Sequence, residues 1–317
     1  MSATVAEVCA TVRAGAGLYD LPDHGSFTLV GPDARRFCNG MFTNNIRALT
    51  PGRGNASAMV DDKARIQGLL RLYNTAPEAF LAVLEGVTPE AFAARYEKYI
   101  IFDDVELTDT SEDLAVLSLQ GPQAAAVLAR LELPTPGPGE HAEGAWRVAE
   151  HARTRAGGWD LIGPRAERAT MIDRALAAGA VAVPFDAQEV LRIEAGLPRW
   201  PADMSDKSLL HELRLVGTHG AFDKGCYIGQ EVINRIDVMG QVTKKFWGLE
   251  LASPAPAPQT EVQLAGEAVG HTLSGAVEGD RARVLALLRK AAWTDGLEVT
   301  VMTADGPRAA TVRDLPF

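Results

Sequence analysis

The residues with the clearest chemical potential lie between 222 and 235, where the chain reads Phe-Asp-Lys-Gly-Cys-Tyr-Ile-Gly-Gln-Glu-Val-Ile-Asn-Arg. In this segment Cys226 follows Lys224 and precedes residues that are able to begin a helix. A nearby lysine and the free N–H groups of a helix start both favour the thiolate, which is the reactive form of cysteine. A lone cysteine is otherwise a small buried apolar residue. The residues alone therefore leave a reactive and a structural role for Cys226 open.

The neighbours of Cys226 are suited to a bound ligand. Five of them either allow close approach of the backbone or supply an amide, a carboxylate or a bidentate donor: Gly225, Gly229, Gln230, Glu231 and Arg235. Residues 205–249 contain six basic and five acidic side chains, whereas the rest of the chain carries a net charge of −11. This near-neutral stretch favours a small anionic ligand, although an ordinary solvated surface has the same composition. A cysteine–histidine pair with His219 is a further alternative.

Glu194 is a second candidate, because it lies among the apolar residues of the stretch 190–198. A carboxylate that is partly removed from water needs a hydrogen-bond donor. Arg192 is one such donor, and the paired N–H groups of a flat heterocycle are another. An internal ion pair explains the sequence equally well.

Composition excludes several classes of protein. The chain has 317 residues, a net charge of −10 and a pI near 5.2, so it repels phosphate backbones and we expect no direct nucleic-acid binding. Its three cysteines show no CxxC spacing, which argues for a reducing compartment and against disulfides or a zinc ribbon; we expect Cys9 and Cys38 to be core residues. The six histidines lack paired-ligand spacing, so we expect no metal site.

The sequence also predicts a cytoplasmic protein. The N-terminal residues lack the basic and apolar regions of a secretory signal, and Glu7 is unusual for a mitochondrial one. No run of eighteen apolar residues occurs, so we expect no membrane span.

A strand-like run followed by Gly-Pro and a helix-prone stretch occurs three times, around Gly31, Gly121 and Gly163. Proline fits the first position of a helix, because its φ is already helical and its missing N–H needs no partner there. We therefore predict helices near 33–39, 88–99, 122–131 and 165–178, and an α+β fold. The Pro- and Gly-rich residues 134–144 are predicted to form a flexible surface loop.

The character of the chain changes near residue 240. Residues 245–251 and 297–301 alternate as strands do, and a Pro-rich break lies at 253–259. We predict two domains, an α+β core over 1–240 and a small C-terminal β-barrel over 241–317. Turns of the barrel are predicted at five glycines: Gly266, Gly270, Gly275, Gly279 and Gly306.

These stretches together resemble the YgfZ-type folate-binding proteins, relatives of the glycine cleavage T-protein, an aminomethyltransferase. Residues 224–231, Lys-Gly-Cys-Tyr-Ile-Gly-Gln-Glu, match the YgfZ signature KGCYxGQE in full, and Arg235 matches the arginine that follows it. Residues 191–196 match the RIEAG segment of the superfamily. Further matches lie at residues 30–37, 43–44, 119–122 and 315–317.

The resemblance implies an aminomethyltransferase-like core that binds tetrahydrofolate or a derivative in a central channel, followed by a β-barrel. It implies that Glu194 binds the pterin ring, that Arg192 and residues 224–231 with Arg235 belong to the binding site, and that Cys226 is the functional thiol. Lys224 and Tyr227 are therefore among the implied binding residues. The family supports maturation or repair of iron–sulfur enzymes, including a tRNA-thiolating one, so the implied partners are a reduced folate and transient iron–sulfur clients.

The chain departs from the family pattern at three places. Asn45-Ile46 replaces Asp-Val after Thr43-Asn44, and His211-Glu212 replaces Pro-Glu. Residues 65–70 align with the segment that holds the T-protein's catalytic aspartate, yet contain no acid.

The sequence thus supports a folate-binding accessory protein for iron–sulfur enzymes, with Cys226 exposed toward the channel. An enzyme that transfers a one-carbon unit onto tetrahydrofolate is the alternative, and it lacks its expected carboxylate. A folate buffer with a buried, inert Cys226 is a third hypothesis.

Overall fold

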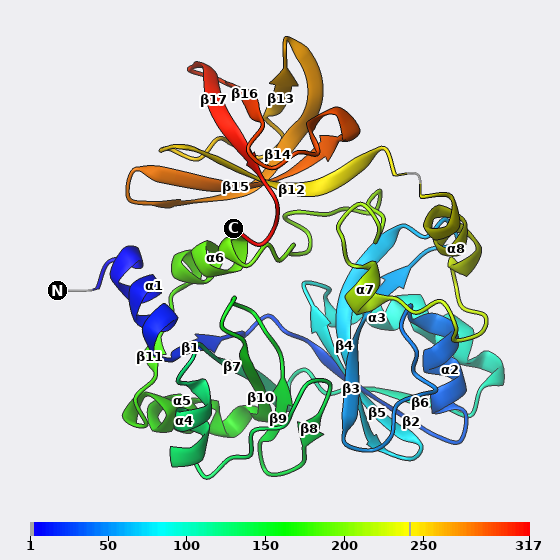
Figure 1. Cartoon of the computed structure of the whole chain (residues 1–317). Helices are drawn as coiled ribbons and strands as arrows, with labels where there is room; N and C mark the ends of the chain where they lie inside the picture. Colours follow the sequence, from blue (N-terminus) through cyan, green and yellow to red (C-terminus); the bar gives the residue numbers. More distant parts are fainter. Residues whose placement is uncertain (1–2, 241) are drawn as a thin grey trace.

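The computed structural model describes residues 3–240 and 242–317 and consists of two sheets with helices and a closed barrel (Figure 1). The barrel lies above the two sheets in this view, and the sheets lie side by side below it. Within the described residues, no helix has the length and apolar character needed to cross a membrane.

The larger sheet has the strand order β11-β1-β7-β10-β9-β8. Only the β1–β11 pair in it is parallel. Its strands are β1 (Gly17–Asp20), β7 (Leu114–Gln120), β8 (His141–Ala142), β9 (Arg147–Glu150), β10 (Gly158–Pro164) and β11 (Val181–Ala182). It carries the helices α1 (Val5–Ala14), α4 (Ala124–Arg130), α5 (Arg168–Ala177) and, ahead of α5, the 3₁₀ turn η2 (Arg165–Glu167).

The second sheet has the order β3-β4-β5-β2-β6 and is antiparallel throughout. Its strands are β2 (Ser26–Val30), β3 (Arg53–Val60), β4 (Ile66–Ala76), β5 (Ala79–Glu85) and β6 (Glu106–Asp109). Three helices cover one face: α2 (Ala34–Met41), α3 (Pro89–Tyr96) and the 3₁₀ helix η1 (Glu97–Phe102).

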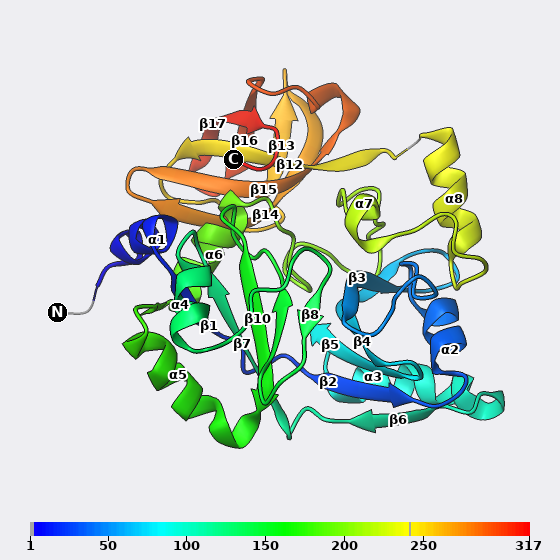
Figure 2. The same ribbon diagram turned by 60° about the horizontal axis from the view of Figure 1, so that its bottom comes forward.

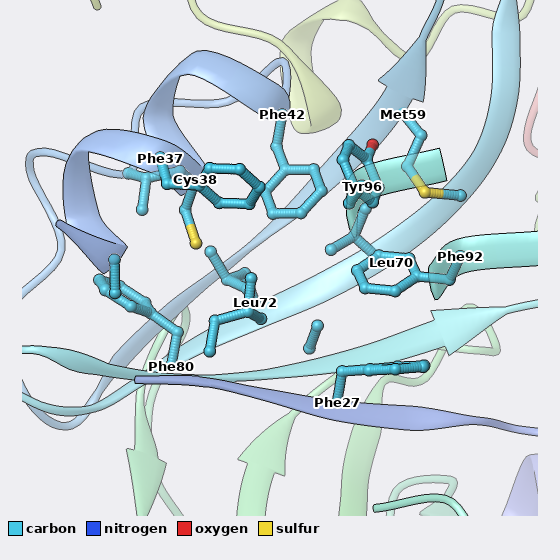
Figure 3. Packing of buried hydrophobic residues seen from close by; sticks show 14 of the residues in the cluster. Phe27, Phe37, Cys38, Phe42, Met59, Leu70, Leu72, Phe80, Phe92 and Tyr96 are labelled. Carbon is cyan, nitrogen blue, oxygen red and sulfur yellow. The ribbon is translucent and has the colours of Figure 1, made fainter. Parts of the chain in front are cut away.

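An aromatic core fills the space between this sheet and its helices. Figure 3 shows the side chains of both layers meeting there, with the sulfur of Cys38 among apolar groups. Phe42 and Phe92 contact Tyr96 at ring-centroid distances of 5.4 and 4.9 Å. Cys38 is fully buried, and burial raises the pKa of its thiol. Cys9 is also fully buried, so both predicted core cysteines are confirmed.

The barrel closes in the order β12-β15-β14-β13-β16-β17, as the sequence predicted for this region. Its strands are β12 (Lys244–Ala252), β13 (Glu261–Leu264), β14 (Glu267–Glu278), β15 (Arg281–Arg289), β16 (Glu298–Thr303) and β17 (Gly306–Arg313), and the 3₁₀ turn η3 (Lys290–Ala292) follows β15.

Three helices lie between the sheets and the barrel: α6 (Phe185–Glu194), α7 (Val216–His219) and α8 (Gln230–Met239). Both views place α6 beneath the barrel and α8 at the far side, beside the chain that leads into β12 (Figures 1 and 2). An ion-pair bridge joins α1, α6 and the barrel, because Arg13 contacts Glu194 at 2.8 Å and Glu278 at 2.6 Å.

The four predicted helices are present, and α3 begins at Pro89, but the prolines of the three Gly-Pro motifs do not begin helices. Helices α2 and α4 start two residues after Pro32 and Pro122, and Pro164 ends strand β10. Gly31 and Gly121 have φ of 145° and 112°, so each chain leaves its strand in a turn that only glycine adopts easily. The proline of each motif belongs to that turn, so its prediction as the first residue of a helix was wrong.

The predicted loop 134–144 is interrupted by β8, whose His141 pairs with β9. Turns at Gly266 and Gly279 are confirmed, and Gly306 begins β17 after its turn. Turns at Gly270 and Gly275 were wrongly predicted, because both residues lie inside β14. A Cβ on Gly270 would lie 2.2 Å from the carbonyl oxygen of Leu287, so glycine there permits close strand approach.

The predicted domain boundary falls at Gln241, which lies outside the described residues. The first barrel strand begins at Lys244, and the segment 1–240 contains two sheets with separate cores. The division at 240 stays a prediction.

Candidate functional site

A cavity of about 720 Å³ opens between the two sheets and below α6. Its lining residues come from chain segments as distant as Tyr19 and His219. Apolar and aromatic side chains form part of the wall, including Leu69, Phe185 and Trp200. A volume of 300–1,000 Å³ with mixed lining is typical of small-molecule sites.

Strands β4 and β5 build one wall by the alternation of side chains along a strand. Leu70 and Leu72 of β4 face the aromatic core, whereas Leu69 and Arg71 face the cavity. On β5 the residue directly opposite Leu69 is Glu85, which also lines the cavity. The same two strands therefore bury apolar residues on one face and present charged groups on the other.

A charged cluster on β10 and the loop after β9 forms the neighbouring wall. Asp160 is 1% exposed, and its carboxylate accepts hydrogen bonds from Arg153 Nε at 3.0 Å and Nη2 at 2.7 Å. His151 Nδ1 lies 2.8 Å from Asp160 Oδ2. Burial opposes the charge on Asp160, but Arg153 and His151 outweigh it and hold the pKa of that carboxyl well below its usual range.

Glu85 is the carboxylate of this wall that faces the cavity. Its side chain is 23% exposed, and its Oε1 lies 3.8 Å from His151 Nε2. Burial acts to raise its pKa, but the charges of His151, Arg153 and Arg71 overcome burial and lower the pKa to about 2. Glu85 is therefore ionised across the neutral pH range.

Several polar atoms at the cavity lack a partner within the described part of the chain. They belong to the hydroxyl of Tyr19, Nε2 of His24 and Nε of Arg71. Burial lowers the pKa of His24 to about 4, and burial likewise lowers that of His219 to about 4. Buried polar atoms without partners are costly unless water or a ligand satisfies them.

Arg192 is a residue of α6 that lines the larger cavity, where a binding residue is expected to lie. Its guanidinium donates to Glu189 at 2.8 Å through both Nε and Nη2, and to Asp203 at 2.7 Å. Arg199 donates to the same Glu189 at 3.1 Å. These ion pairs occupy Arg192, so it supports the cavity wall more than it offers a free donor.

Glu194 lies elsewhere, at a smaller cavity of about 350 Å³ between α1 and α6. It is 15% exposed, and its carboxylate accepts hydrogen bonds from Arg13 Nε at 3.0 Å and Nη2 at 2.8 Å. Of the two readings that the residues left open, the structure contains the internal ion pair. A role of Glu194 toward a pterin ring stays a prediction.

The segment 224–231 is docked on helix α2 and on the turn that follows β3. Ile228 N donates to Gly40 O at 3.1 Å, and a Cβ on Gly229 would lie 2.7 Å from Asp61 O. Among the described residues that line these two cavities, none belongs to the predicted binding set of this segment: Lys224, Gly225, Tyr227, Gly229, Gln230, Glu231 and Arg235. In the structure these residues dock a loop and begin helix α8, and they do not line either cavity.

Lys224 anchors this loop. It is 2% exposed, and its Nζ donates to Phe42 O and, at 2.6 Å, to Asn44 O. The ammonium also lies 4.5 Å from the ring centroid of Tyr227. Burial lowers the pKa of Lys224 to about 7.

Cys226 is exposed, so the burial that the third hypothesis expected is wrong, and a structural role for the thiol stays a prediction. Cys226 is not among the described residues that line the cavity, and its exposure toward the channel stays a prediction. His219 lines the cavity, and the structure records no hydrogen bond between it and Cys226 among the described residues.

Sequence reasoning missed the charged cavity residues Arg71, Glu85, His151 and Arg153, and it missed Asp160, which pairs with the last two. A signal was present, because Arg71 interrupts the apolar run 69–73, and Glu85 ends the run 79–84. A charge inside an otherwise buried strand needs a partner or a ligand. Within residues 3–240 and 242–317, no three His, Cys, Asp or Glu side chains are grouped to hold a metal ion.

Comparison with known proteins gives this arrangement a family. The model of the GCVT N-terminal domain matches residues 1–218. An aminomethyltransferase of Herpetosiphon aurantiacus is 30% identical, over 99% of this chain and 89% of its own length. One from Moorella thermoacetica is 31% identical, over 96% and 87%. A putative chloroplastic transferase of Arabidopsis thaliana is 26% identical, over 90% and 68%.

Among solved structures, the glycine cleavage system aminomethyltransferase T from Bartonella henselae superimposes with a TM-score of 0.89 at 22% identity. The match covers 98% of this chain and 89% of that one, so the two chains share their fold, the barrel included. With two sheets, a C-terminal barrel and sequence similarity along nearly the whole chain, this protein belongs to the GCVT family.

Proposed function

We propose that this protein binds a reduced folate in the 720 Å³ cavity. The observation that carries the proposal is a cavity with an ionised carboxylate, Glu85, and polar atoms of Tyr19, His24 and Arg71 that have no partner within the described residues. A pterin supplies N–H donors, a carbonyl acceptor and ring nitrogens that are able to satisfy such atoms.

The remaining lining fits the other parts of a folate. Leu69, Phe185 and Trp200 offer apolar and aromatic surface to flat rings. Arg199 is 38% exposed and offers a cation to the carboxylates of a glutamyl tail, although it also pairs with Glu189. Membership of the GCVT family, whose relatives include proteins named aminomethyltransferase, supports the same ligand.

We further propose that the folate-bound protein acts as a YgfZ-type accessory factor for iron–sulfur enzymes. The complete signature at 224–231 supports this role, and so does the exposed Cys226, which is accessible to a partner protein. The segment 65–70 contains no acid where the T-protein has its catalytic aspartate. A cytoplasmic location and transient contact with client enzymes belong to this proposal.

Transfer of a one-carbon unit to tetrahydrofolate is the second candidate. The names of the relatives favour it over the accessory role. Glu85 also favours it, because this carboxylate lies directly opposite Leu69, at the place where the acid is missing from β4. A carboxylate beside a folate nitrogen is what general acid–base chemistry would require.

Calorimetric titration with tetrahydrofolate and 5-formyltetrahydrofolate tests the ligand. We expect saturable binding to the wild type and to Cys226→Ala with equal affinity, because Cys226 is not among the described residues that line the cavity. Trp200→Ala should weaken binding, because it removes aromatic surface from the cavity wall. An absence of binding to the wild type would refute the folate proposal.

Complementation separates the two uses of the folate. In a deletion strain that lacks its YgfZ-type protein, Cys226→Ala should fail to restore tRNA thiolation, whereas Cys9→Ala, a buried control, should restore it. Full restoration by Cys226→Ala would disprove the thiol's accessory role. Formation of methylenetetrahydrofolate from an aminomethylated carrier, measured with purified protein, would instead establish the second candidate.

A further inference from the structure

The segment 224–239, which contains the loop of Cys226 and helix α8, is held at both ends by basic side chains that are largely buried. Lys224 is its first residue, and His211 contacts Asp237 near its last. Helix α8 is otherwise held lightly, because Ile233 is its one buried side chain among the described residues. Elements with few buried contacts open locally before the rest of a protein unfolds.

Lys224 is buried without a counter-charge. Its Nζ donates to the backbone oxygens of Phe42 and Asn44, and no carboxylate pairs with it among the described residues. The charged or titratable groups that face it from α2 and from the loop after α2 are the thiol of Cys38 and the guanidinium of Arg47. Burial raises the pKa of Cys38, so this thiol is uncharged, and Arg47 has the same sign as an ammonium. A neutral amine keeps two hydrogens for the two carbonyls, so this site favours the neutral form.

Two neighbours of Lys224 in the chain do not supply the missing charge. The ring of Tyr227 lies 4.5 Å from Nζ and attracts a cation, but burial raises the pKa of Tyr227 to about 12, so its hydroxyl stays uncharged. Asp223 is exposed and forms no ion pair within the described chain. Burial is the main reason that the pKa of Lys224 falls to about 7. The docked segment therefore buries a charge at pH 6 that it does not carry at pH 9.

His211 is the second base, and its acidic partner is too weak to hold a proton on it. Both ring nitrogens lack a hydrogen-bond partner among the described residues, and Nε2 lies 3.8 Å from Asp237 Oδ1. The side chain of His211 is 12% exposed but that of Asp237 is 48% exposed, so water screens the carboxylate. Burial outweighs Asp237 and lowers the pKa of His211. The neighbouring Glu212 accepts from Leu209 N at 3.2 Å, and Lys244 of β12 is a further cation that acts on Glu212.

The residues 208–212 place His211 where three parts of the molecule meet. The backbone oxygen of Ser208 accepts from β4 at 2.9 Å, and that of Glu212 accepts from β12 at 2.8 Å. The same stretch contacts α8 through the imidazole of His211. A proton on His211 therefore acts on α8 from a base that the second sheet and the barrel hold in place.

We propose that the segment 224–239 is an acid-released flap, docked while Lys224 and His211 are neutral and freed when they take up protons. In the released state water solvates the ammonium and the imidazolium, which the docked state buries without a close counter-charge. Release also frees the loop that fixes Cys226 against α2. The flap thus controls how far the exposed thiol reaches, and this inference does not depend on the folate proposal.

The direction and the range of the pH effect follow from linkage. A basic group whose pKa is lower in the docked state than in water weakens docking as the pH falls from the free value toward the docked value. For Lys224 these values are 10.5 and about 7, so the population of the open flap should rise by about 50-fold between pH 9 and pH 7 and level off below. His211 adds a further rise below its ordinary value of 6.5.

Hydrogen exchange of the whole protein tests the flap. The rates are measured by mass spectrometry from pH 5.5 to 9 and divided by the intrinsic rate at each pH. Wild-type peptides from 224–239 should exchange faster as the pH falls, and barrel peptides should not. Lys224→Met should remove the change above pH 7, and His211→Leu should remove the change below it. Lys290→Met and His271→Leu are barrel controls that should keep the wild-type profile.

The opposite results would overturn the proposal. Exchange of 224–239 that stays constant or slows in acid would do so, and so would a wild-type profile in both Lys224→Met and His211→Leu. An equal change in the barrel would show a global loss of stability in place of a flap. If Lys224→Met does not fold, Lys224→Arg takes its place, and its permanent charge should leave the segment open at every pH. Asp237→Asn removes the weak partner of His211 and should increase opening below pH 7.

Discussion

Asp160 shows what a single buried charge contributes to this protein. Its carboxylate is almost fully buried, and Arg153 and His151 are bound to it. Replacing it with asparagine keeps the shape but leaves Arg153 buried without a counter-charge. We expect Asp160→Asn to lower the free energy of unfolding at neutral pH by about 3–5 kcal/mol. Urea titration measures this loss.

The pH dependence of that loss follows from the lowered pKa of Asp160. A carboxyl whose pKa is depressed by folding contributes stability that is fully present above its unfolded value of 3.8 and is lost as the pH falls through the folded value. The difference between wild type and Asp160→Asn should therefore stay constant from neutral pH to about pH 4 and shrink below it.

Asp20→Asn is the matched control for this prediction. Asp20 also pairs with an arginine, Arg168, but its side chain is 38% exposed. We expect a loss below about 1 kcal/mol. Equal losses in the two variants would contradict the importance of burial.

At the scale of an element, helix α8 is bounded by two left-handed glycines. Gly229 precedes it with φ of 79°, and Gly240 follows it with φ of 63°. A Cβ on Gly229 would lie 2.7 Å from Asp61 O, whereas a Cβ on Gly240 would meet nothing within 4 Å. The two ends of the helix therefore share a left-handed backbone conformation and differ in their surroundings.

Alanine substitutions use this difference. Gly240→Ala should cost about 1–2 kcal/mol of unfolding free energy, which is the price of the left-handed conformation for a residue with a Cβ. Gly229→Ala should cost clearly more, because the loop that carries Cys226 must also move away from Asp61. Thermal unfolding measures both, and equal losses would show that the loop adapts freely.

Elements were predictable where local residues decide them. Strand-like runs, Gly-Pro turns and helix-prone stretches predicted α2, α4 and α5, and alternation predicted β12 and β16. Gly270 and Gly275 were misjudged, because glycine inside a strand serves close contact with a partner strand that the local sequence does not reveal.

At the scale of the whole molecule, the core and the barrel are tied together by charge and backbone. Arg13 of α1 joins Glu194 and the barrel residue Glu278, and Asp203 accepts from Ser274 N of the barrel at 2.9 Å. We expect a single calorimetric unfolding transition, since the two parts share these contacts. A barrel that melts separately would contradict this coupling.

Arg13→Met tests the bridge. Because Arg13 is one third exposed, we expect a loss of about 1 kcal/mol and a transition temperature lower by about 2 °C. Arg53→Met is the control. It breaks an exposed ion pair with Glu140 that lies within the segment 1–240 and does not reach the barrel, so it should shift the transition temperature less. A larger shift for Arg53→Met would argue that the bridge adds nothing.

The cavity was the part of the molecule that sequence reasoning could not assemble. The signature around Cys226 is contiguous and therefore visible, yet it forms a docked loop. Arg71 and Glu85 lie on the paired strands β4 and β5, but Asp160 is far from them in the chain, and only the packing of two sheets brings its cluster to the same cavity. Their joint role depends on tertiary contacts, which local pattern does not encode.

The parallel pairing of β1 with β11 has a consequence for synthesis on the ribosome. Gly17 and Leu18 pair with Val181 and Ala182, and α1 packs against α6. The pairing of β1 with β11 and the packing of α1 against α6 therefore cannot form until more than 160 further residues have been translated, whereas β1 can pair with β7 earlier. At about 5–20 residues per second, roughly 8–32 s pass in which α1 and the β11 edge of β1 remain available to chaperones and proteases.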